Sequence, residues 1–219
     1  MHNIVQNLVD IQNKINSHLE EHKIDKVPKI IAVSKTFKIE KILPLIDHGH
    51  KHFGENKVQE AVDKWTEIKL SNPNIQLHLI GKLQTNKVKF ALKIFDYIHS
   101  VDSEKLAKKI SDEQIKINKK IKIFIQVNIG QEDQKSGTSV NELSSLISYC
   151  NKINLDVVGL MCIPPINEDP VIYFEKMKKL NEENKFNELS MGMSSDYLKA
   201  AMNNATYLRI GSSIFGQRY

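Results

Sequence analysis

The chain has 219 residues, of which 41% are hydrophobic, so it is long enough and apolar enough to bury a sizeable core. Its formal net charge is +5, but the lysines are interleaved with Asp and Glu and form no basic tail, which argues against a nucleic-acid-binding protein. No apolar run is long enough to cross a membrane, and the N-terminal segment lacks the pattern of a secretory signal. Cys150 and Cys162 offer neither a disulfide framework nor a metal-binding spacing, so we expect a cytoplasmic protein without a metal site.

Short apolar runs alternate with helical patterns along the chain. The first segment, 4–22, is expected to form an amphipathic helix, because its apolar residues recur at spacings of three and four. Strands are expected at 30–34, 52–55, 75–80, 97–101, 121–129, 155–163, 188–191 and 205–210. Helices are expected between them at 38–48, 58–70, 84–95, 103–117, 140–150, 170–184 and 194–203.

This alternation predicts parallel strands joined by helical crossovers. Eight such units indicate a closed (β/α)8 barrel of the TIM type, formed as a single domain over residues 1–219. The extra N-terminal helix is expected to cover the barrel wall. An open doubly wound sheet is the alternative, and the absence of a GxGxxG motif after any strand weakens its dinucleotide-binding version.

In such a barrel the chemistry lies at the carboxyl ends of the strands, and Lys35 follows the first one. A strand end aims a side chain and partly desolvates it. Desolvation favours the neutral amine, which can attack a carbonyl carbon to form a Schiff base. Most lysines at strand ends are simply solvated, so this hypothesis depends on what the other strand ends carry. Those ends carry Glu55, Asn56, His78, Asn128, Met161, Pro164, the segment 191–194, Arg209, Gly211 and Ser212.

The loops after the seventh and eighth strands have the composition of a phosphate site, which barrels of this type often place there. Ser194 is expected to begin a helix, so that its hydroxyl and the free amides of the first turn face outward. Gly192 and Gly211 permit close approach of the backbone to an anion, and Ser212 adds a further donor. A single serine at such a position is more typical of a helix cap than of a ligand-binding residue. Because two such loops occur together here, phosphate binding and helix capping are equally supported.

A phosphate site opposite a Schiff-base lysine indicates a phosphorylated aldehyde, of which pyridoxal 5'-phosphate (PLP) is an example. PLP also needs a partner for its pyridine nitrogen. Only two of the 31 basic residues are arginines, Arg209 and Arg218, so Arg209 marks a place where a planar, permanent cation is needed. The alternative for Arg209 is a surface ion pair. Asn56 is expected either to bind the cofactor or to cap a helix, and His78 to be structural, with a buried partner near the barrel mouth.

Motifs in a consistent order make the chain similar to the pyridoxal phosphate homeostasis protein family over residues 28–218. They are AVSKT (32–36), FGENKVQE (53–60), HLIGKLQTNK (78–87), HSVDS (99–103), IQVNI (125–129), KSG (135–137), GLMCIPP (159–165), SMGMSSD (190–196) and RIGSSIFGQR (209–218). The resemblance implies a fold-type III PLP barrel like the N-terminal domain of alanine racemase. It also implies that Lys35 carries the Schiff base and that Arg209 faces the pyridine nitrogen. The other residues it implies are Ser194, Gly211 and Ser212 at the phosphate, and Asn56 beside the cofactor.

The resemblance further implies a protein that carries or buffers PLP for vitamin B6 and amino-acid homeostasis, without robust turnover of its own, and that has PLP-dependent apo-enzymes as partners. The absence of an obvious exposed apolar patch in the sequence favours a monomer. A racemase needs acid–base groups on both faces of the substrate carbon, and no tyrosine or cysteine lies at a strand end opposite Lys35. An arginine at the ring nitrogen would also make the ring a weaker electron sink. The alternatives are a small PLP-dependent racemase or lyase that uses Lys35 as base, and a PLP-independent barrel with an aldolase-type lysine.

Overall fold

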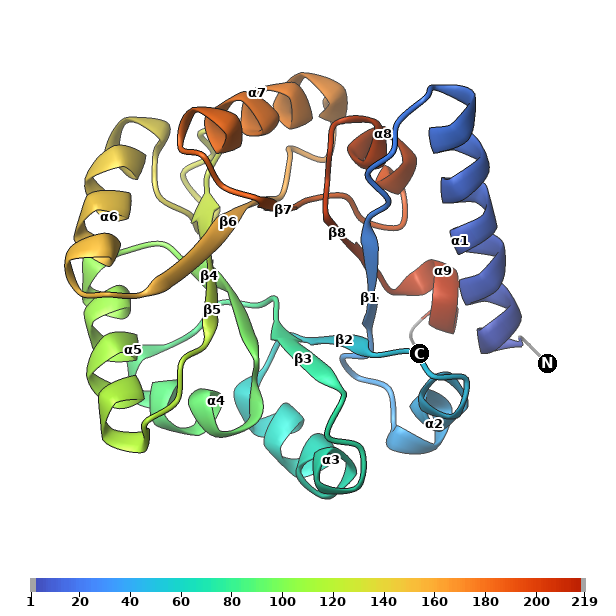
Figure 1. The fold of residues 1–219 in the computed structure, drawn as a ribbon, viewed down its shortest axis with the longest axis horizontal. Coiled ribbons are helices and arrows are strands. Elements are labelled where there is room, and N and C mark those ends of the chain that lie inside the picture. Colours follow the sequence, from blue (N-terminus) through green and yellow to red (C-terminus); the bar gives the residue numbers. More distant parts are fainter. Residues whose placement is uncertain (1–2, 218–219) are drawn as a thin grey trace.

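The closed barrel expected from the sequence is present in the computed structural model, which describes residues 3–217 (Figure 1). Its strands are parallel and pair in chain order, and β1 pairs with β8 to close the sheet. They are β1 (Lys29–Val33), β2 (His52–Glu55), β3 (Gln76–Leu79), β4 (Tyr97–Val101), β5 (Lys122–Val127), β6 (Asp156–Cys162), β7 (Glu188–Ser190) and β8 (Tyr207–Ile210). Each overlaps one expected strand, so the (β/α)8 architecture is confirmed and the open sheet is excluded.

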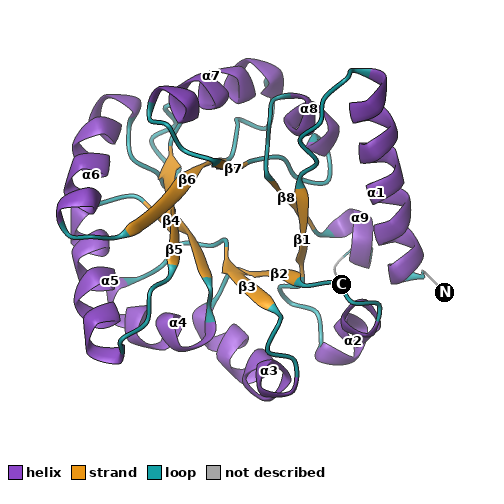
Figure 2. Ribbon diagram, viewed as in Figure 1, coloured by secondary structure: helices purple, strands orange, loops and turns teal. Residues whose placement is uncertain are grey.

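A ring of helices surrounds the strands (Figure 2). These are α1 (Ile4–Glu21), α2 (Ile39–Asp47), α3 (Val58–Ser71), α4 (Val88–Ile94), α5 (Glu104–Ile117), α6 (Val140–Lys152), α7 (Pro170–Glu183), α8 (Tyr197–Met202) and α9 (Ser212–Phe215), with a 3-10 turn η1 (Thr85–Lys87) before α4. The additional helix α1 packs against α2, α8 and α9 on the outer wall, as expected from the sequence.

The side chains of β1 illustrate how alternation along a strand builds two cores. Ile30 and Ala32 belong to the main hydrophobic cluster between the strands and the helices, whereas Ile31 belongs to a second cluster inside the barrel. That interior cluster also contains Tyr97, Phe124, Met161 and Tyr207. Successive strand residues face opposite sides, so a strand buried on both sides must be apolar throughout, which is why these strands read as continuous apolar runs.

The segment after β7 differs from the expectation. Helix α8 begins at Tyr197, and residues 194–196 form a turn in which the backbone amide of Met193 donates to Asp196 Oδ1. The prediction that Ser194 begins a helix is therefore wrong. The physical reason is that the Asp196 side chain bonds to nearby backbone and so competes with a helical turn. The short helix α9, which follows β8, was also not expected.

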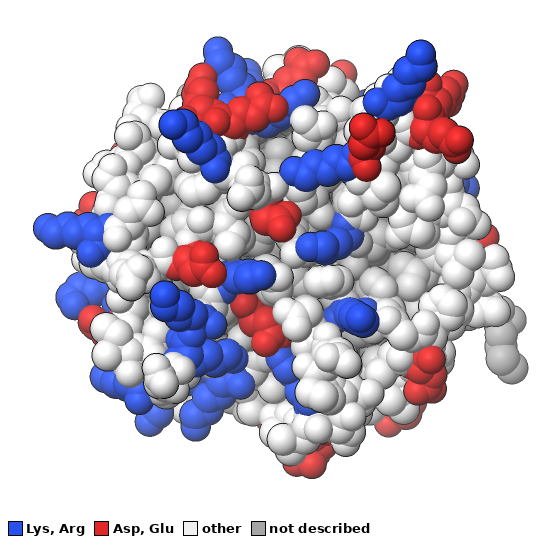
Figure 3. All heavy atoms as spheres, in the orientation of Figure 1, with Lys and Arg blue, Asp and Glu red and all other residues white. Residues whose placement is uncertain are grey.

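Charged side chains of both signs are interspersed over the face shown in Figure 3, with lysines densest at its lower left, near α4 and α5. Lysines on α5 have acidic neighbours one turn away: Lys108 pairs with Asp112, and Lys109 pairs with Glu113. None of the helices within residues 3–217 has both the length and the apolar character needed to span a membrane.

Candidate functional site

A cavity of about 700 Å³ opens where the strands end, at the carboxyl-terminal mouth of the barrel. It is lined by residues that follow several different strands, as expected for this fold. All six residues that the sequence analysis assigned to cofactor binding lie on it: Lys35, Asn56, Ser194, Arg209, Gly211 and Ser212. The fold thus brings together residues spread over nearly the whole chain, and their role in binding stays a prediction.

Lys35 lines the cavity at the end of β1, which is anchored by hydrogen bonds of the preceding residue. The preceding Ser34 is fully buried and turns away, so that its hydroxyl donates to Glu55 Oε1 at 2.8 Å. The same carboxylate oxygen accepts from Lys64 Nζ at 3.0 Å and from Trp65 Nε1 at 2.9 Å. These bonds tie the end of β1 to β2 and α3, directly behind Lys35.

Glu55, which the sequence analysis placed among the strand ends, is therefore a brace and does not line the cavity. Its side chain has no exposed surface, and this burial raises the pKa of the carboxyl, while the Coulombic attraction of Lys64 and the hydrogen bonds to its oxygen act in the opposite direction. The second oxygen, Oε2, has no hydrogen-bond partner. Retaining a carboxylate here costs desolvation, which the Lys64 ion pair offsets.

Arg209, on β8, is a buried cation that reaches the cavity with only 4% of its surface exposed. Its Nη1 donates to Ser190 Oγ at 2.7 Å and its Nη2 to the Cys162 carbonyl at 2.8 Å. Burial lowers the pKa of the guanidinium, yet an arginine remains protonated in proteins. The alternative of a surface ion pair is wrong for Arg209, and Arg218 lies outside the described residues.

The loops after β7 and β8 meet at Ser194, on the phosphate side predicted from the sequence. Ser194 Oγ accepts from the backbone amides of Gly211 and Ser213, each at 3.4 Å. Bonds of this length are weak, so both amides retain most of their capacity to bind a stronger acceptor. Gly192 has φ +86°, and a Cβ there would lie 2.5 Å from Ala200 Cβ, so only glycine fits this turn.

Asn56 lines the cavity beside Gly81, whose added Cβ would lie 2.3 Å from the Asn56 carbonyl oxygen. Its Oδ1 is a buried oxygen with no hydrogen-bond partner. The cap position of α3 is Lys57, which makes no side-chain capping bond, so the alternative that Asn56 caps this helix is wrong. An orphaned polar atom on a cavity wall is a group that a ligand can satisfy.

Sequence reasoning missed further residues on the cavity wall. Lys82 and Lys135 both line it, and Lys135 also pairs with Glu132 and donates to the Pro164 carbonyl. Gln126, on β5, reaches it with its amide donating to the Ser136 carbonyl at 3.0 Å. The segments that carry Lys82, Gln126 and Lys135 were among the family-like motifs, which was the signal available for finding them.

His78 does not line the cavity. The sequence analysis expected it to be structural, with a buried partner near the barrel mouth. It is fully buried inside the barrel, where it hydrogen-bonds His52 and His99. Burial holds its pKa well below the usual range, and the neighbouring His99 adds to this effect. A buried structural role with partners is confirmed, but those partners lie along the barrel interior.

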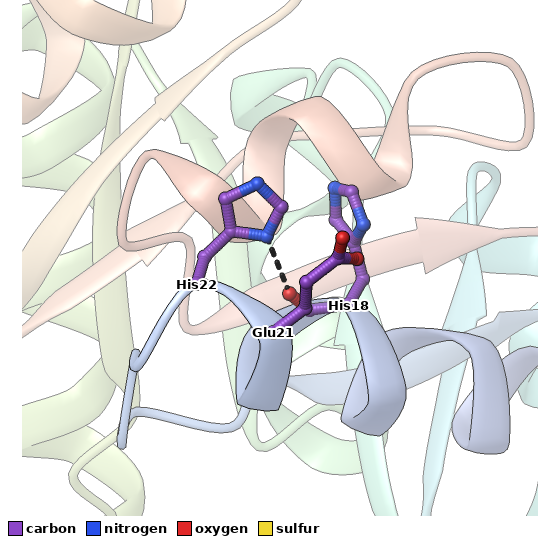
Figure 4. Close-up of side chains that lie close together, drawn as sticks. All are labelled: His18, Glu21 and His22. Carbon is purple, nitrogen blue, oxygen red and sulfur yellow. Dashed lines mark hydrogen bonds between the residues drawn. The ribbon is translucent and has the colours of Figure 1, made fainter.

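One group of potential metal ligands exists outside the barrel, among residues 3–217. His18, Glu21 and His22 lie at the C-terminal end of α1, where His22 is the C-cap residue, and their ligand atoms are within 4.8 Å of one another (Figure 4). Glu21 and His22 are exposed and His18 is half-buried, and His22 Nδ1 contacts the His18 carbonyl at 2.8 Å. Exposed His and Glu side chains commonly stay solvated without an ion, and α1 covers the outer wall, so this cluster is no part of the mouth.

Comparison with known proteins gives consistent matches. Residues 7–219 match the family model described as alanine racemase, N-terminal domain. A pyridoxal phosphate homeostasis protein of Pasteurella multocida is 34% identical over 227 residues, covering 98% of this chain and 97% of its own. Another from Aquifex aeolicus is 38% identical over 200 residues, covering 87% of each chain.

Solved structures of related proteins have the same barrel fold. PipY of Synechococcus elongatus, determined with PLP bound, is 32% identical with a TM-score of 0.80, covering 92% of this chain and all of its own. An alanine racemase of Clostridium difficile has a TM-score of 0.75 at 16% identity, which shows the shared barrel fold alone, and this chain covers 57% of it. With a complete barrel, a cavity at its mouth and relatives matched over nearly their full length, the chain belongs to the pyridoxal phosphate homeostasis protein family.

Proposed function

We propose that this chain binds PLP as a Schiff base on Lys35 and serves as a cytoplasmic carrier or buffer of PLP. The observation that carries the proposal is the convergence, on one cavity, of a lysine amine, a buried arginine and two loops rich in amide and hydroxyl donors. A volume of about 700 Å³ lies within the ~300–1,000 Å³ typical of small-molecule sites.

The residues fit the chemical parts of PLP. Lys35 supplies the amine for the aldehyde. The hydroxyls of Ser194 and Ser212 and the backbone amides of Gly211 and Ser213 supply donors for the phosphate. Arg209 supplies a permanent cation for the pyridine nitrogen. Asn56 Oδ1 lacks a partner and is available to a polar substituent of the cofactor. When bound, PLP supplies an aldehyde that exchanges between amines, which is the chemistry that a carrier requires.

The same residues argue against efficient turnover. A cation facing the pyridine nitrogen disfavours its protonation, which weakens the ring as an electron sink. Among the described residues, the cavity wall includes no tyrosine or cysteine to complement Lys35 as a second acid–base group. The relatives are named homeostasis proteins, and one solved relative holds PLP, which supports a binding role for this chain. We further infer a monomer, with residues 1–219 forming one PLP-binding domain and PLP-dependent apo-enzymes as recipients.

Borohydride reduction of the PLP-loaded protein, followed by peptide mass mapping, tests the proposal. Reduction fixes a Schiff base as a stable secondary amine, so we expect one pyridoxyl adduct, on Lys35. Adducts spread over many lysines would contradict a specific site. A protein that stays colourless with added PLP would favour PLP-independent lysine chemistry instead.

A PLP-dependent racemase or lyase remains the second candidate, because Lys82 and Lys135 share the cavity with Lys35 and could move protons there. Incubation of the loaded protein with single L-amino acids in deuterated water distinguishes the two functions. Exchange of the α-proton well above the rate with free PLP would support an enzyme, and exchange at the rate of free PLP would support the carrier.

A further inference from the structure

Four hydrogen bonds in series run through the barrel interior from Arg209. Arg209 Nη1 bonds to Ser190 Oγ at 2.7 Å, and Ser190 Oγ contacts His99 Nδ1 at 2.9 Å. The chain continues from His99 Nε2 to His78 Nδ1 at 2.9 Å, and from His78 Nε2 to His52 Nδ1 at 3.0 Å. We call Ser190, His99, His78 and His52 the histidine column. They come from β7, β4, β3 and β2, in that order, and none of the four lines the mouth cavity.

The permanent donor at one end determines the direction of every bond in the column. Arg209 can only donate, so Ser190 Oγ accepts from it. The only other contact of Ser190 Oγ, among the described residues, is His99 Nδ1, so its own hydrogen must go there. His99 Nδ1 is then an acceptor. The opposite direction would leave the buried hydroxyl hydrogen of Ser190 without an acceptor, which is costly.

The same logic assigns the proton of each imidazole. With its Nδ1 accepting, His99 carries its proton on Nε2 and donates to His78 Nδ1. His78 in turn carries its proton on Nε2 and donates to His52 Nδ1. His52 is the first residue of β2 and only partly buried, so water can accept from its outer Nε2–H. All three rings are therefore neutral Nε2–H tautomers, and every lone pair on Nδ1 points toward Arg209.

Burial and packing both favour this arrangement. His78 and His99 are fully buried, and desolvation holds their pKa values well below the usual range, with the neighbouring charge of Arg209 adding to the effect on His99. Burial lowers the pKa of His52 to about 4. The His78 ring stacks on Tyr97 with centroids 4.3 Å apart, and the His99 ring stacks on Phe124 at the same separation. The rings are thus held in place as well as neutral.

We propose that His99, His78 and His52 are positioning residues, which act through Ser190 to hold Arg209 at the cofactor cavity as a cation with no hydrogen-bonded carboxylate. Asp196 attracts the guanidinium electrostatically but makes no hydrogen bond to it. Among the described residues, no carboxylate hydrogen-bonds Arg209; its partners are Ser190 and the Cys162 carbonyl. A carboxylate would stabilise the buried guanidinium but would also cancel most of its field. A series of aligned neutral dipoles solvates the cation and leaves its charge directed at the cavity. This role rests on the proposed function, in which Arg209 faces the pyridine nitrogen.

Nitrogen-15 NMR of the histidine rings tests the column directly, and it needs no cofactor. In protein labelled at histidine, near pH 7, we expect three neutral Nε2–H rings, assigned to His52, His78 and His99 by single replacements. An Nδ1–H tautomer or a protonated ring at any of these positions would overturn the proposal. The result is independent of PLP binding, so failure of the column and failure of the proposed function are distinguishable.

A matched pair of variants tests the link to Arg209. Ser190→Ala removes one buried hydroxyl from the column, whereas Tyr207→Phe removes one from the barrel interior outside it, where the Tyr207 hydroxyl contacts Tyr97 and Lys29. In Ser190→Ala we expect loss of the single-tautomer signal of His99 and a shift of the visible band of the PLP-loaded protein. In Tyr207→Phe both should match wild type. An unchanged His99 signal and band in folded Ser190→Ala would contradict the proposal. If that variant does not fold, the wild-type tautomers alone decide.

Discussion

The mouth and the amino-terminal half of the barrel are built from the same strands yet are opposite in character. At the mouth, small and polar residues such as Gly81, Gly211 and Ser212 leave a cavity of about 700 Å³. In the amino-terminal half, Tyr97 and Tyr207 fill the interior. The Nζ of Lys29 lies 5.0 Å from the centroid of the Tyr207 ring, and the Nζ of Lys122 lies 5.3 Å from the centroid of the Tyr97 ring. The difference shows that tight packing in one half of the barrel supports an open cavity in the other half. The histidine column lies between them and reaches the cavity through Arg209.

The largest expected effect separates chemistry at the mouth from stability. Lys35→Ala should abolish the covalent PLP adduct, because the proposed function assigns the Schiff base to the Lys35 amine and not to the other lysines of the cavity. The free energy of unfolding should change less than it does when a buried core side chain is truncated. Mass spectrometry after borohydride reduction, together with urea unfolding, measures both. The control is Lys82→Ala, which removes another amine from the same cavity and should keep the adduct. A full adduct in Lys35→Ala would contradict the assignment.

The reverse separation is expected for the packed interior. Ile31 has no exposed surface and belongs to the interior cluster, so Ile31→Ala should lower the free energy of unfolding by about 2–5 kcal/mol. Ile31→Val, which deletes a single methylene, should cost about 0.5–1.5 kcal/mol. Chemical denaturation measures these values, and the PLP stoichiometry of the folded fraction should not change. A stability equal to wild type in Ile31→Ala would mean that this half of the barrel is not tightly packed.

A smaller effect should distinguish a serine at the mouth from a serine at a helix end. Ser194→Ala should weaken PLP binding by roughly tenfold, since a hydrogen bond to a charged group contributes about 1.5 kcal/mol or more. Equilibrium titration of the apoprotein measures this change. Ser139→Ala is the matched control: Ser139 caps α6 by accepting from the Glu142 amide at 3.2 Å, so its loss should reduce stability by ~1 kcal/mol and leave PLP affinity unchanged. Equal PLP affinities in both variants would argue against phosphate binding at Ser194.

The last effect concerns acid stability and is absent at neutral pH. Burial lowers the pKa of His50 from 6.5 to about 4, so the unfolded chain binds a proton there before the folded chain does. Stability is therefore unaffected above pH 6.5 and falls as the pH drops from 6.5 toward 4. His50→Gln keeps a donor for the His52 carbonyl but does not titrate, so its stability should fall less steeply, by up to about 1.4 kcal/mol per pH unit. Parallel slopes for the two proteins would show that His50 is not buried as a neutral ring.

The elements of the fold were largely predictable because each one carries its own local signal. The run Ile30–Val33 reads as a buried strand, and the apolar spacing over 4–22 reads as a helix, without reference to anything distant. The candidate site was predictable because, in a parallel barrel, every strand end lies at the same mouth. The start of α8 was not, because the turn at Ser194 depends on a bond between the Asp196 side chain and the backbone.

The sequence by itself determined the alternation of strands and helices, the placement of Lys35 and Arg209 at strand ends, and the resemblance to a PLP-binding family. Only the tertiary structure decided that Glu55 turns behind the site and that His52, His78 and His99 form one column with Ser190. Local patterns fix which residues form a strand and which face they share, since these follow from backbone geometry. Which side chains meet across the barrel depends on the register of strands far apart in the chain, and no local pattern encodes that.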